Sequence, residues 1–152
     1  MMIELSIRKA RRSDIAQLIL FQLQLAEETE NLKLNQATLE LGMSAMFDDP
    51  AKGEYYVAET PEGLVGCHMV TYEWSDWRNG MVYWLQSVYV KAEYRKHGVF
   101  RKMFINLMNE IKTNPRIAGL RLYVDKSNAR AQQVYAAMGM NGDHYTVFEW
   151  MK

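Results

Sequence analysis

Apolar and polar residues alternate along several stretches of the chain in the way that half-buried strands require. They do so over residues 2–9, 55–59 and 64–74. The last two stretches flank a Pro-Glu-Gly sequence at 61–63, whose residues fix or permit tight backbone angles, so they predict a hairpin. Residues 81–90 are almost continuously apolar and aromatic, which is typical of a central strand.

Other stretches carry apolar residues three and four positions apart, which predicts helices. The expected helices start after Ser13 or Asp14 and end in the acidic run at 27–30, cover 36–47, run from Gly98 to about Thr113, and run from Asn128 to Met138. Residues 120–124 and 144–151 alternate again and predict two further strands. The resulting order, β-α-α-β-β-β-α-β-α-β, favours an α+β sheet with helices on its faces.

The chain has 152 residues with no repeat or linker, which predicts a single domain over 1–152. Its 18 basic residues balance 18 acidic ones, so we expect no nucleic-acid partner and no membrane partner, and any anion site must be local. The apolar runs are shorter than the ~20 residues of a membrane helix. The first residues lack the apolar core of a signal peptide and Cys67 is a single cysteine, so we expect a cytoplasmic protein.

A basic loop follows the expected central strand. Arg95, Lys96 and Arg101 surround Gly98, where a helix is expected to start. Free N–H groups and the positive end of a helix dipole attract anions, and these side chains would complement a pyrophosphate. A solvated basic surface explains this segment equally well when it is taken alone.

Two segments together resemble the GNAT superfamily of N-acetyltransferases. A strand such as residues 85–90 is followed in that family by [Q/R]-x-x-G-x-[G/A], which Arg95 and Gly98 match. A later segment, N-x-x-A-x-x-x-Y-x-x-x-G-[FM], is matched by Asn128, Ala131, Tyr135, Gly139 and Met140. The resemblance covers nearly the whole chain and implies a GNAT-like acyl-CoA N-acyltransferase fold, in which helices flank both faces of a central mixed, mostly antiparallel sheet.

The first motif departs from the family pattern at one position. Phe100 stands where glycine or alanine is usual, which bears on how a phosphate would pack. We expect its ring to turn into the core rather than onto a cofactor, because Phe104 follows one helical turn later.

The resemblance implies an acyltransferase that moves the acetyl group of acetyl-CoA directly to an amine, without an acyl-enzyme. The backbone of Val88 and Val90 would bind the pantetheine arm, and an N–H near Val88 would polarise the acetyl carbonyl. Tyr135 is the predicted catalytic acid for the CoA thiolate, although an aromatic residue of this kind outside such a motif is more often a core residue. The predicted cofactor-binding residues are Val88, Tyr89, Val90, Arg95, Lys96, His97, Gly98, Val99, Phe100, Arg101, Asn128, Ala131 and Tyr135.

The general base stays unassigned. Several relatives carry Glu or His at the position of Gln86, which cannot accept a proton from an ammonium group. Glu73 could act through water, as could Glu27 or Glu28. The acidic run that holds the last two is also typical of a solvated helix face.

Several other residues favour structural roles. The spacing of His68, His97 and His144 predicts no metal site, and Cys67 lies in an apolar strand, which predicts a core thiol. One aromatic set could be core, the wall of an acceptor pocket or a dimer contact: Tyr72, Trp74, Trp77, Tyr83 and Trp84. Relatives are often dimers, and exposed aromatic residues near Trp74 and Trp77 would be compatible with a homodimer.

Two alternative functions stay open. A CoA-binding or sensing domain without catalysis would explain Gln86 and the missing base. A generic nucleotide-binding module is disfavoured because neither G-x-x-x-x-G-K-[ST] nor G-x-G-x-x-G occurs. The expected partner is a small-molecule or peptide amine, and the sequence does not identify it.

Overall fold

The structure of the chain is a computed structural model that describes residues 3–152. It separates into two units, one ending at Arg121 and one from Leu122 to Lys152, and each is described by itself. The single domain expected over residues 1–152 stays a prediction. No described helix has the length and apolar character that a membrane crossing requires.

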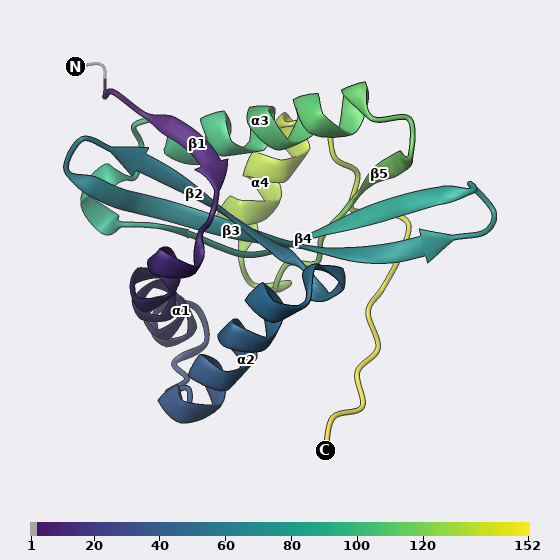
Figure 1. Ribbon diagram of the computed structural model, residues 1–152. Helices are drawn as coiled ribbons and strands as arrows, with labels where there is room; N and C mark the ends of the chain where they lie inside the picture. The colour runs from purple at the N-terminus through teal and green to yellow at the C-terminus, as the bar shows by residue number, and fades with distance from the viewer. Residues whose placement is uncertain (1–2) are drawn as a thin grey trace. The chain divides into compact units, whose positions relative to one another are not determined.

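The first unit is built on one five-stranded sheet with the order β1-β2-β3-β4-β5 (Figure 1). The strands are β1 (Ser6–Lys9), β2 (Glu54–Thr60), β3 (Gly63–Ser75), β4 (Gly80–Val90) and β5 (Ile117–Arg121). The first four are antiparallel to their neighbours, whereas β5 runs parallel to β4. This arrangement confirms the predicted mixed, mostly antiparallel sheet.

The fifth strand begins earlier than predicted. It starts at Ile117, which pairs with Met81, and it ends where Arg121 pairs with Trp84. The prediction that Leu122 and Val124 belong to it was wrong. Alternation marks which residues can share a face, but the parallel partner β4 decides which residues form the strand.

Three helices of the first unit connect these strands. They are α1 (Ile15–Glu30), α2 (Gln36–Asp48) and α3 (Val99–Thr113), and short 3₁₀ turns precede β2 and α3 at η2 (Pro50–Lys52) and η3 (Ala92–Tyr94). Asn35 begins α2 by accepting a 2.9 Å hydrogen bond from the Thr38 N–H. The predicted helix over 36–47 is therefore confirmed to within one residue.

Helices cover both faces of the sheet in the first unit (Figure 1). On one face, α1 and α2 pack on Val57 and Cys67 of the sheet. On the other, Val99 and Met103 of α3 pack against Ala58. Val57 and Ala58 point to opposite faces because they are adjacent in a strand, so the predicted arrangement of helices on both faces is confirmed.

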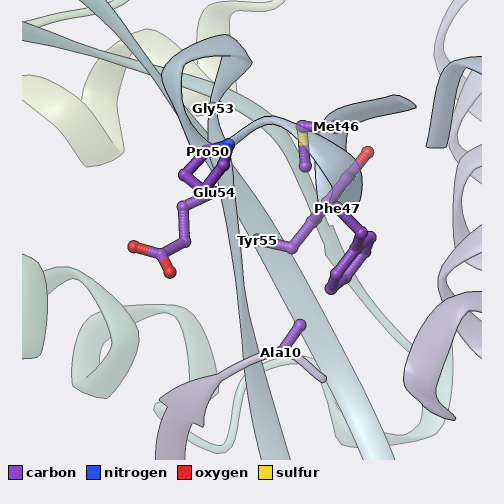
Figure 2. Close-up of a pocket in the computed structure, with 7 residues that line it drawn as sticks. All are labelled: Ala10, Met46, Phe47, Pro50, Gly53, Glu54 and Tyr55. Carbon is purple, nitrogen blue, oxygen red and sulfur yellow. The ribbon is translucent and has the colours of Figure 1, made fainter. Parts of the chain in front are cut away.

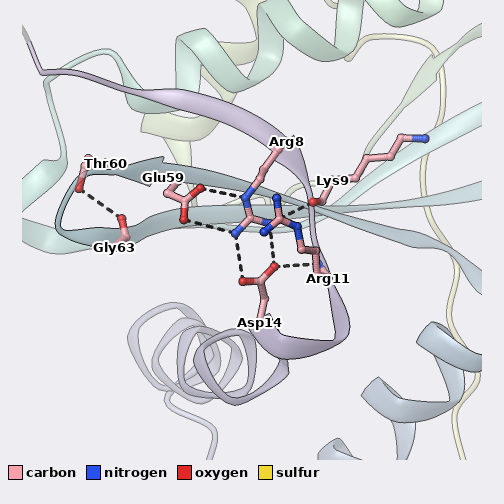
Figure 3. Close-up of polar contacts among 7 residues, drawn as sticks. All are labelled: Arg8, Lys9, Arg11, Asp14, Glu59, Thr60 and Gly63. Carbon is pink, nitrogen blue, oxygen red and sulfur yellow. Dashed lines mark hydrogen bonds and ion pairs between the residues drawn. The ribbon is translucent and has the colours of Figure 1, made fainter.

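A cluster of charges ties β1 to the start of α1. Arg8 lies between two carboxylates, 2.8 Å from Asp14 and 2.9 Å from Glu59 (Figure 3). Asp14, the last residue of the 3₁₀ turn η1 (Arg12–Asp14), also accepts a 2.7 Å hydrogen bond from the N–H of Arg11, which precedes that turn. Hydrogen bonds donated by the Arg8 guanidinium hold the pKa of the Asp14 carboxyl below its usual value. The cluster, which we call the Arg8 cluster, fixes β1, β2 and α1 together.

The second unit contains α4 (Ala129–Ala137). Asn128 begins it as predicted, since its side chain accepts a 3.1 Å hydrogen bond from the Ala131 N–H. Gly139 ends it in the left-handed region with φ 93°, and the Met140 N–H donates to the Tyr135 carbonyl at 3.0 Å. Both helix boundaries follow from local capping chemistry.

The strand predicted over 144–151 was wrong. These residues lie in no strand or helix. Alternation gives a segment two faces, but a strand also needs a hydrogen-bonded neighbour, and residues 144–151 are paired with none among those described.

Candidate active site

The second half of β4 has an open side in the first unit. Its pairing with β5 ends at Trp84, so within the described part of this unit no strand pairs with residues 85–90 on that side. On the other side, the Lys91 N–H donates to the Val65 carbonyl of β3 at 2.8 Å. Backbone groups of successive strand residues alternate in direction. The N–H and C=O groups of Val88 and Val90 therefore point toward the open side.

A β-bulge interrupts β4 just before these residues. Cys67 pairs with Tyr89 and Met69 pairs with Gln86, so two residues of β4, Ser87 and Val88, face the single residue between them in β3. Ser87 adopts a left-handed conformation with φ 54°. Bulges redirect backbone groups, and this one sets the direction of the Val88 N–H.

Buried groups on the α1 side hold the bulge. The Cys67 thiol donates to the Ser87 carbonyl at 3.7 Å, and the Gln22 amide donates to the Cys67 sulfur at 3.7 Å. Burial raises the pKa of the Cys67 thiol to about 12, so it remains a protonated donor at neutral pH. Burial also raises the pKa of the Tyr55 phenol, and a side-chain hydrogen bond with Ser87 partly offsets this increase. The predicted core thiol is confirmed, and it has a defined hydrogen-bonding role.

The loop between β4 and α3 has the backbone geometry of an anion site. Lys96 and Gly98 both have positive φ, 66° and 78°. The first backbone hydrogen bond of α3 runs from the Lys102 N–H to the Gly98 carbonyl. The N–H groups of the residues just before Lys102 therefore have no partner within the helix. Left-handed residues in such a loop turn successive N–H groups into a concave surface, at the positive end of the helix dipole.

Arg95 folds back from this loop onto α1. Its Nε donates to the Val90 carbonyl at 2.8 Å, and its Nη2 lies 2.6 Å from Oε2 of Glu28. The guanidinium carbon is 5.5 Å from the centre of the Tyr89 ring, and the Tyr89 hydroxyl donates to Oε1 of Gln24 at 2.8 Å. We call Gln24, Glu28, Tyr89 and Arg95 the Arg95 bridge, because they join α1 to the end of β4.

The remaining residues of the loop are placed as follows. Lys96, His97 and Arg101 are exposed, whereas Val99 is buried in the core beneath α3. The Phe100 ring packs on Phe104, with 5.9 Å between the ring centres. Phe100 itself is half-buried, and its contact with the buried Phe104 agrees with the expectation that its ring turns toward the core.

The second unit holds the other predicted residues. The side chain of Asn128 caps α4 through the Ala131 N–H, and Tyr135 lies about two turns along the same helix. Burial raises the pKa of the Tyr135 phenol above its usual value of 10.0. The phenol therefore carries its proton at neutral pH, which is the state an acid requires.

Two of the candidate bases, Glu73 and Glu28, contact other side chains in the first unit, and so does Gln86. Gln86 donates from its amide to the Thr71 hydroxyl. Glu73 accepts a 2.8 Å hydrogen bond from the Trp84 indole and is ion-paired with Arg121 at 3.2 Å. Glu28 is occupied in the Arg95 bridge. None of these contacts assigns the base.

Sequence patterns did not reveal the groups that support the site. No sequence signal marks Ser87 as a left-handed residue, since it is not a glycine. The partnership between Glu28 and Arg95 joins residues 67 positions apart. The only signal in the sequence for this ion pair is its chemistry: Arg95 of the first motif is basic, and the end of α1 is acidic.

Two hollows of the surface lie away from the end of β4 and the loop before α3. One pocket of about 80 Å³ lies between α2 and β2 (Figure 2). It is lined by Ala10, Met46, Phe47, Pro50, Gly53, Glu54 and Tyr55. A second of about 440 Å³ lies beside β1 and the β2–β3 turn. Among the described residues, no three His, Cys, Asp or Glu side chains gather as metal ligands.

The predicted aromatic set divides between half-buried and exposed residues. Tyr72 and Tyr83 contact each other across β3 and β4 with 5.1 Å between ring centres. Trp74 and Trp77, at the tip of that hairpin, are 59% and 90% exposed. The exposed tryptophans remain available for a contact with an acceptor or a partner.

Comparisons with known proteins agree on one family. The chain matches the family described as "Acetyltransferase (GNAT) family" over residues 16–140. The thialysine N-epsilon-acetyltransferase of Bos taurus is 35% identical over 81 residues, which are 52% of this chain and 46% of the bovine protein. The match thus spans about half the length of that relative.

Solved structures extend the likeness over the whole chain. A possible acetyltransferase from Clostridium difficile 630 has a TM-score of 0.92 at 39% identity, with 97% of each chain covered. A predicted acetyltransferase with acetyl-CoA from Clostridium acetobutylicum has a TM-score of 0.76 at 18% identity, with 96% of each chain covered. At that identity the second likeness shows the fold alone.

Proposed function

We propose that this chain, which belongs to the acetyltransferase (GNAT) family of acyltransferases, transfers the acetyl group of acetyl-CoA to a primary amine. One observation carries the proposal: the bulged end of β4 leads directly into the left-handed basic loop before α3. Open backbone groups are thus followed by an anion-binding loop. CoA combines an amide-rich arm with a pyrophosphate in the same order.

In the proposed reaction the amine nitrogen attacks the acetyl carbonyl carbon and the carbon–sulfur bond then breaks. The Val88 N–H, directed by the bulge, would stabilise the negative charge that develops on the carbonyl oxygen. Backbone groups of Val88 and Val90 would hold the pantetheine arm like an added strand. The N–H groups of residues 96–101 would bind the pyrophosphate.

Proton transfer completes the proposed reaction. Tyr135 would give its phenol proton to the departing CoA thiolate, and its raised pKa keeps that proton in place until then. The proton lost by the amine would pass to water, since Gln86 cannot accept it. The roles of Asn128 and Ala131 follow from their match to the family motif, in which they shape the start of α4.

The acceptor is proposed to be a primary amine on a small molecule or peptide. The bovine relative is named for transfer to an ε-amine, which supports this class. We also expect a homodimer in the cytoplasm. Light scattering during size-exclusion chromatography would show whether the dimer forms.

Thermal unfolding with ligands tests the cofactor proposal. Acetyl-CoA at 100 times its Kd should stabilise the protein by about 2.7 kcal/mol, which raises the Tm by about 5 to 10 °C. Arg101→Glu should reduce the shift, whereas Lys112→Glu, at the far end of α3, should retain it. An equal shift with ATP or NAD would instead support a generic nucleotide-binding module, and no shift with acetyl-CoA would contradict the proposal.

A CoA-binding or sensing domain is the second candidate. Gln86, held by Thr71, stands where several relatives carry a base, and this observation favours it. A panel of amines with acetyl-CoA separates the candidates, since only a transferase releases free CoA in an amine-dependent way. Binding of acetyl-CoA without any turnover would support the sensing domain.

A further inference from the structure

The guanidinium of Arg95 is already occupied by protein groups. Its Nε donates to the Val90 carbonyl at 2.8 Å, and its Nη2 contacts the Glu28 carboxylate at 2.6 Å. Arg95 and Val90, which form the first of these contacts, both belong to the proposed cofactor site. Arg95 supplies charge for a phosphate, and Val90 supplies a carbonyl for the pantetheine arm.

The contact between Arg95 and Glu28 is easily broken. The two side chains are 40% and 43% exposed, and exposed ion pairs contribute little because water competes for both charges. A phosphate group accepts two parallel hydrogen bonds from a guanidinium, and the two phosphates of a pyrophosphate together carry more negative charge than one carboxylate. A pyrophosphate in the adjacent loop would therefore outcompete Glu28 for Arg95.

We propose that Glu28 is a positioning residue that competes with the phosphates of acetyl-CoA for Arg95. Cofactor binding then moves the guanidinium from Glu28 to phosphate and frees the Val90 carbonyl for the pantetheine arm. The inference rests on the proposed function, because it takes acetyl-CoA as the ligand of the loop. It adds a residue of α1 that no part of either sequence motif contains.

Release of Glu28 also changes the charge at the end of α1. Glu27, Glu28 and Glu30 are exposed there, and in the free protein Arg95 offsets one of them. Once Arg95 binds phosphate, the Glu28 carboxylate regains its full attraction for a cation. Bound acetyl-CoA thus increases the affinity for an ammonium acceptor, and the acceptor increases the affinity for acetyl-CoA by the same factor.

Titration calorimetry of acetyl-CoA into the wild-type protein and Glu28→Gln tests the competition. The variant lacks the competing charge and should bind acetyl-CoA about two- to five-fold more tightly, the range that one exposed ion pair allows. Glu30→Gln removes the same charge from the last turn of α1 without touching Arg95. It should change the Kd less than Glu28→Gln does.

The same substitution in an Arg95→Gln background isolates the contact. Glu28→Gln should then change the Kd by no more than Glu30→Gln does, because the shared guanidinium is gone. Weaker or unchanged binding by Glu28→Gln alone, in a variant that retains the wild-type Tm, would overturn the competition. If the wild-type protein fails to bind acetyl-CoA at all, the proposed function itself fails, which is a separate outcome.

Discussion

The thiol of Cys67 donates a hydrogen bond to the carbonyl of Ser87, with 3.7 Å between sulfur and oxygen. This contact crosses from β3 to the bulge of β4, where Ser87 has a φ of 54°. A residue buried in the α1 core therefore supports the backbone that directs the Val88 N–H. The direction of the proposed oxyanion donor, the Val88 N–H, therefore depends on the packing of the core around Cys67.

The left-handed conformation of Ser87 predicts an inverted response to glycine. At ordinary strand positions glycine is less stable than alanine by roughly 0.5 to 1 kcal/mol. At Ser87 we expect Ser87→Gly to be more stable than Ser87→Ala by about 1 kcal/mol, because a Cβ strains a left-handed residue. Both variants lack the hydroxyl, so the difference between their free energies of unfolding in urea reports the effect of the Cβ alone. Greater stability of Ser87→Ala would contradict the bulge.

The Arg8 cluster predicts a loss of stability in acid. Hydrogen bonds from Arg8 hold the pKa of Asp14 below its usual 3.8, so the unfolded chain binds the proton more readily than the folded one. The stabilisation is complete above about pH 3.8 and is lost as the pH falls through the lowered pKa. Asp14→Asn should destabilise the neutral protein by about 1.5 to 3 kcal/mol.

Urea unfolding at neutral and acid pH measures this difference. The gap between wild type and Asp14→Asn should narrow as the pH falls below 3.8. Asp48→Asn removes an exposed partner of Arg12 and should have a much smaller effect at neutral pH. A gap that stays constant into acid would show that Asp14 does not act through its charge.

The buried His68 predicts a second loss of stability, at a higher pH than that of the Arg8 cluster. Its ring is 2% exposed, stacks on Tyr56, and has no hydrogen-bond partner on either nitrogen among the described residues. Burial lowers its pKa from 6.5 to about 4. Between these values the unfolded chain binds a proton that the folded chain does not, so stability falls by roughly 3 kcal/mol as the pH drops through the window.

Replacing His68 should remove that dependence. His68→Leu should reduce the slope of the free energy of unfolding against pH between pH 6.5 and 4. His97→Asn, at an exposed loop position, should leave that slope unchanged. Chemical unfolding at several pH values gives both slopes. An unchanged slope in His68→Leu would mean that other groups cause the acid sensitivity.

Tyr135 predicts a specific loss of catalysis. Tyr135→Phe should lower kcat by about 10² to 10⁴-fold, since the thiolate then leaves without an acid. The KM for acetyl-CoA should change little, because the ring remains. Tyr145→Phe, in the exposed C-terminal segment, is the matched control. The assay uses whichever amine the screen identifies, and a variant with wild-type kcat would remove Tyr135 from the mechanism.

Local chemistry made much of the chain predictable from its sequence. Asn128 starts α4 and Gly139 ends it through hydrogen bonds that reach only a few residues along the chain. The periodicity of apolar residues likewise predicted the α+β class, and two motifs predicted the family that the comparisons show. The roles of the individual site residues stay predictions.

Contacts between distant segments were decided only by the tertiary structure. The bulge at Ser87 depends on the register of β3 against β4, and the partner of Arg95 comes from α1, 67 positions away. Residues 144–151 alternate as a strand would, yet they form none. Sequence by itself determined how each segment can fold, because capping and periodicity act within a few residues. Register, strand pairing and ion-pair partners required the backbone positions of segments that lie far apart in the chain.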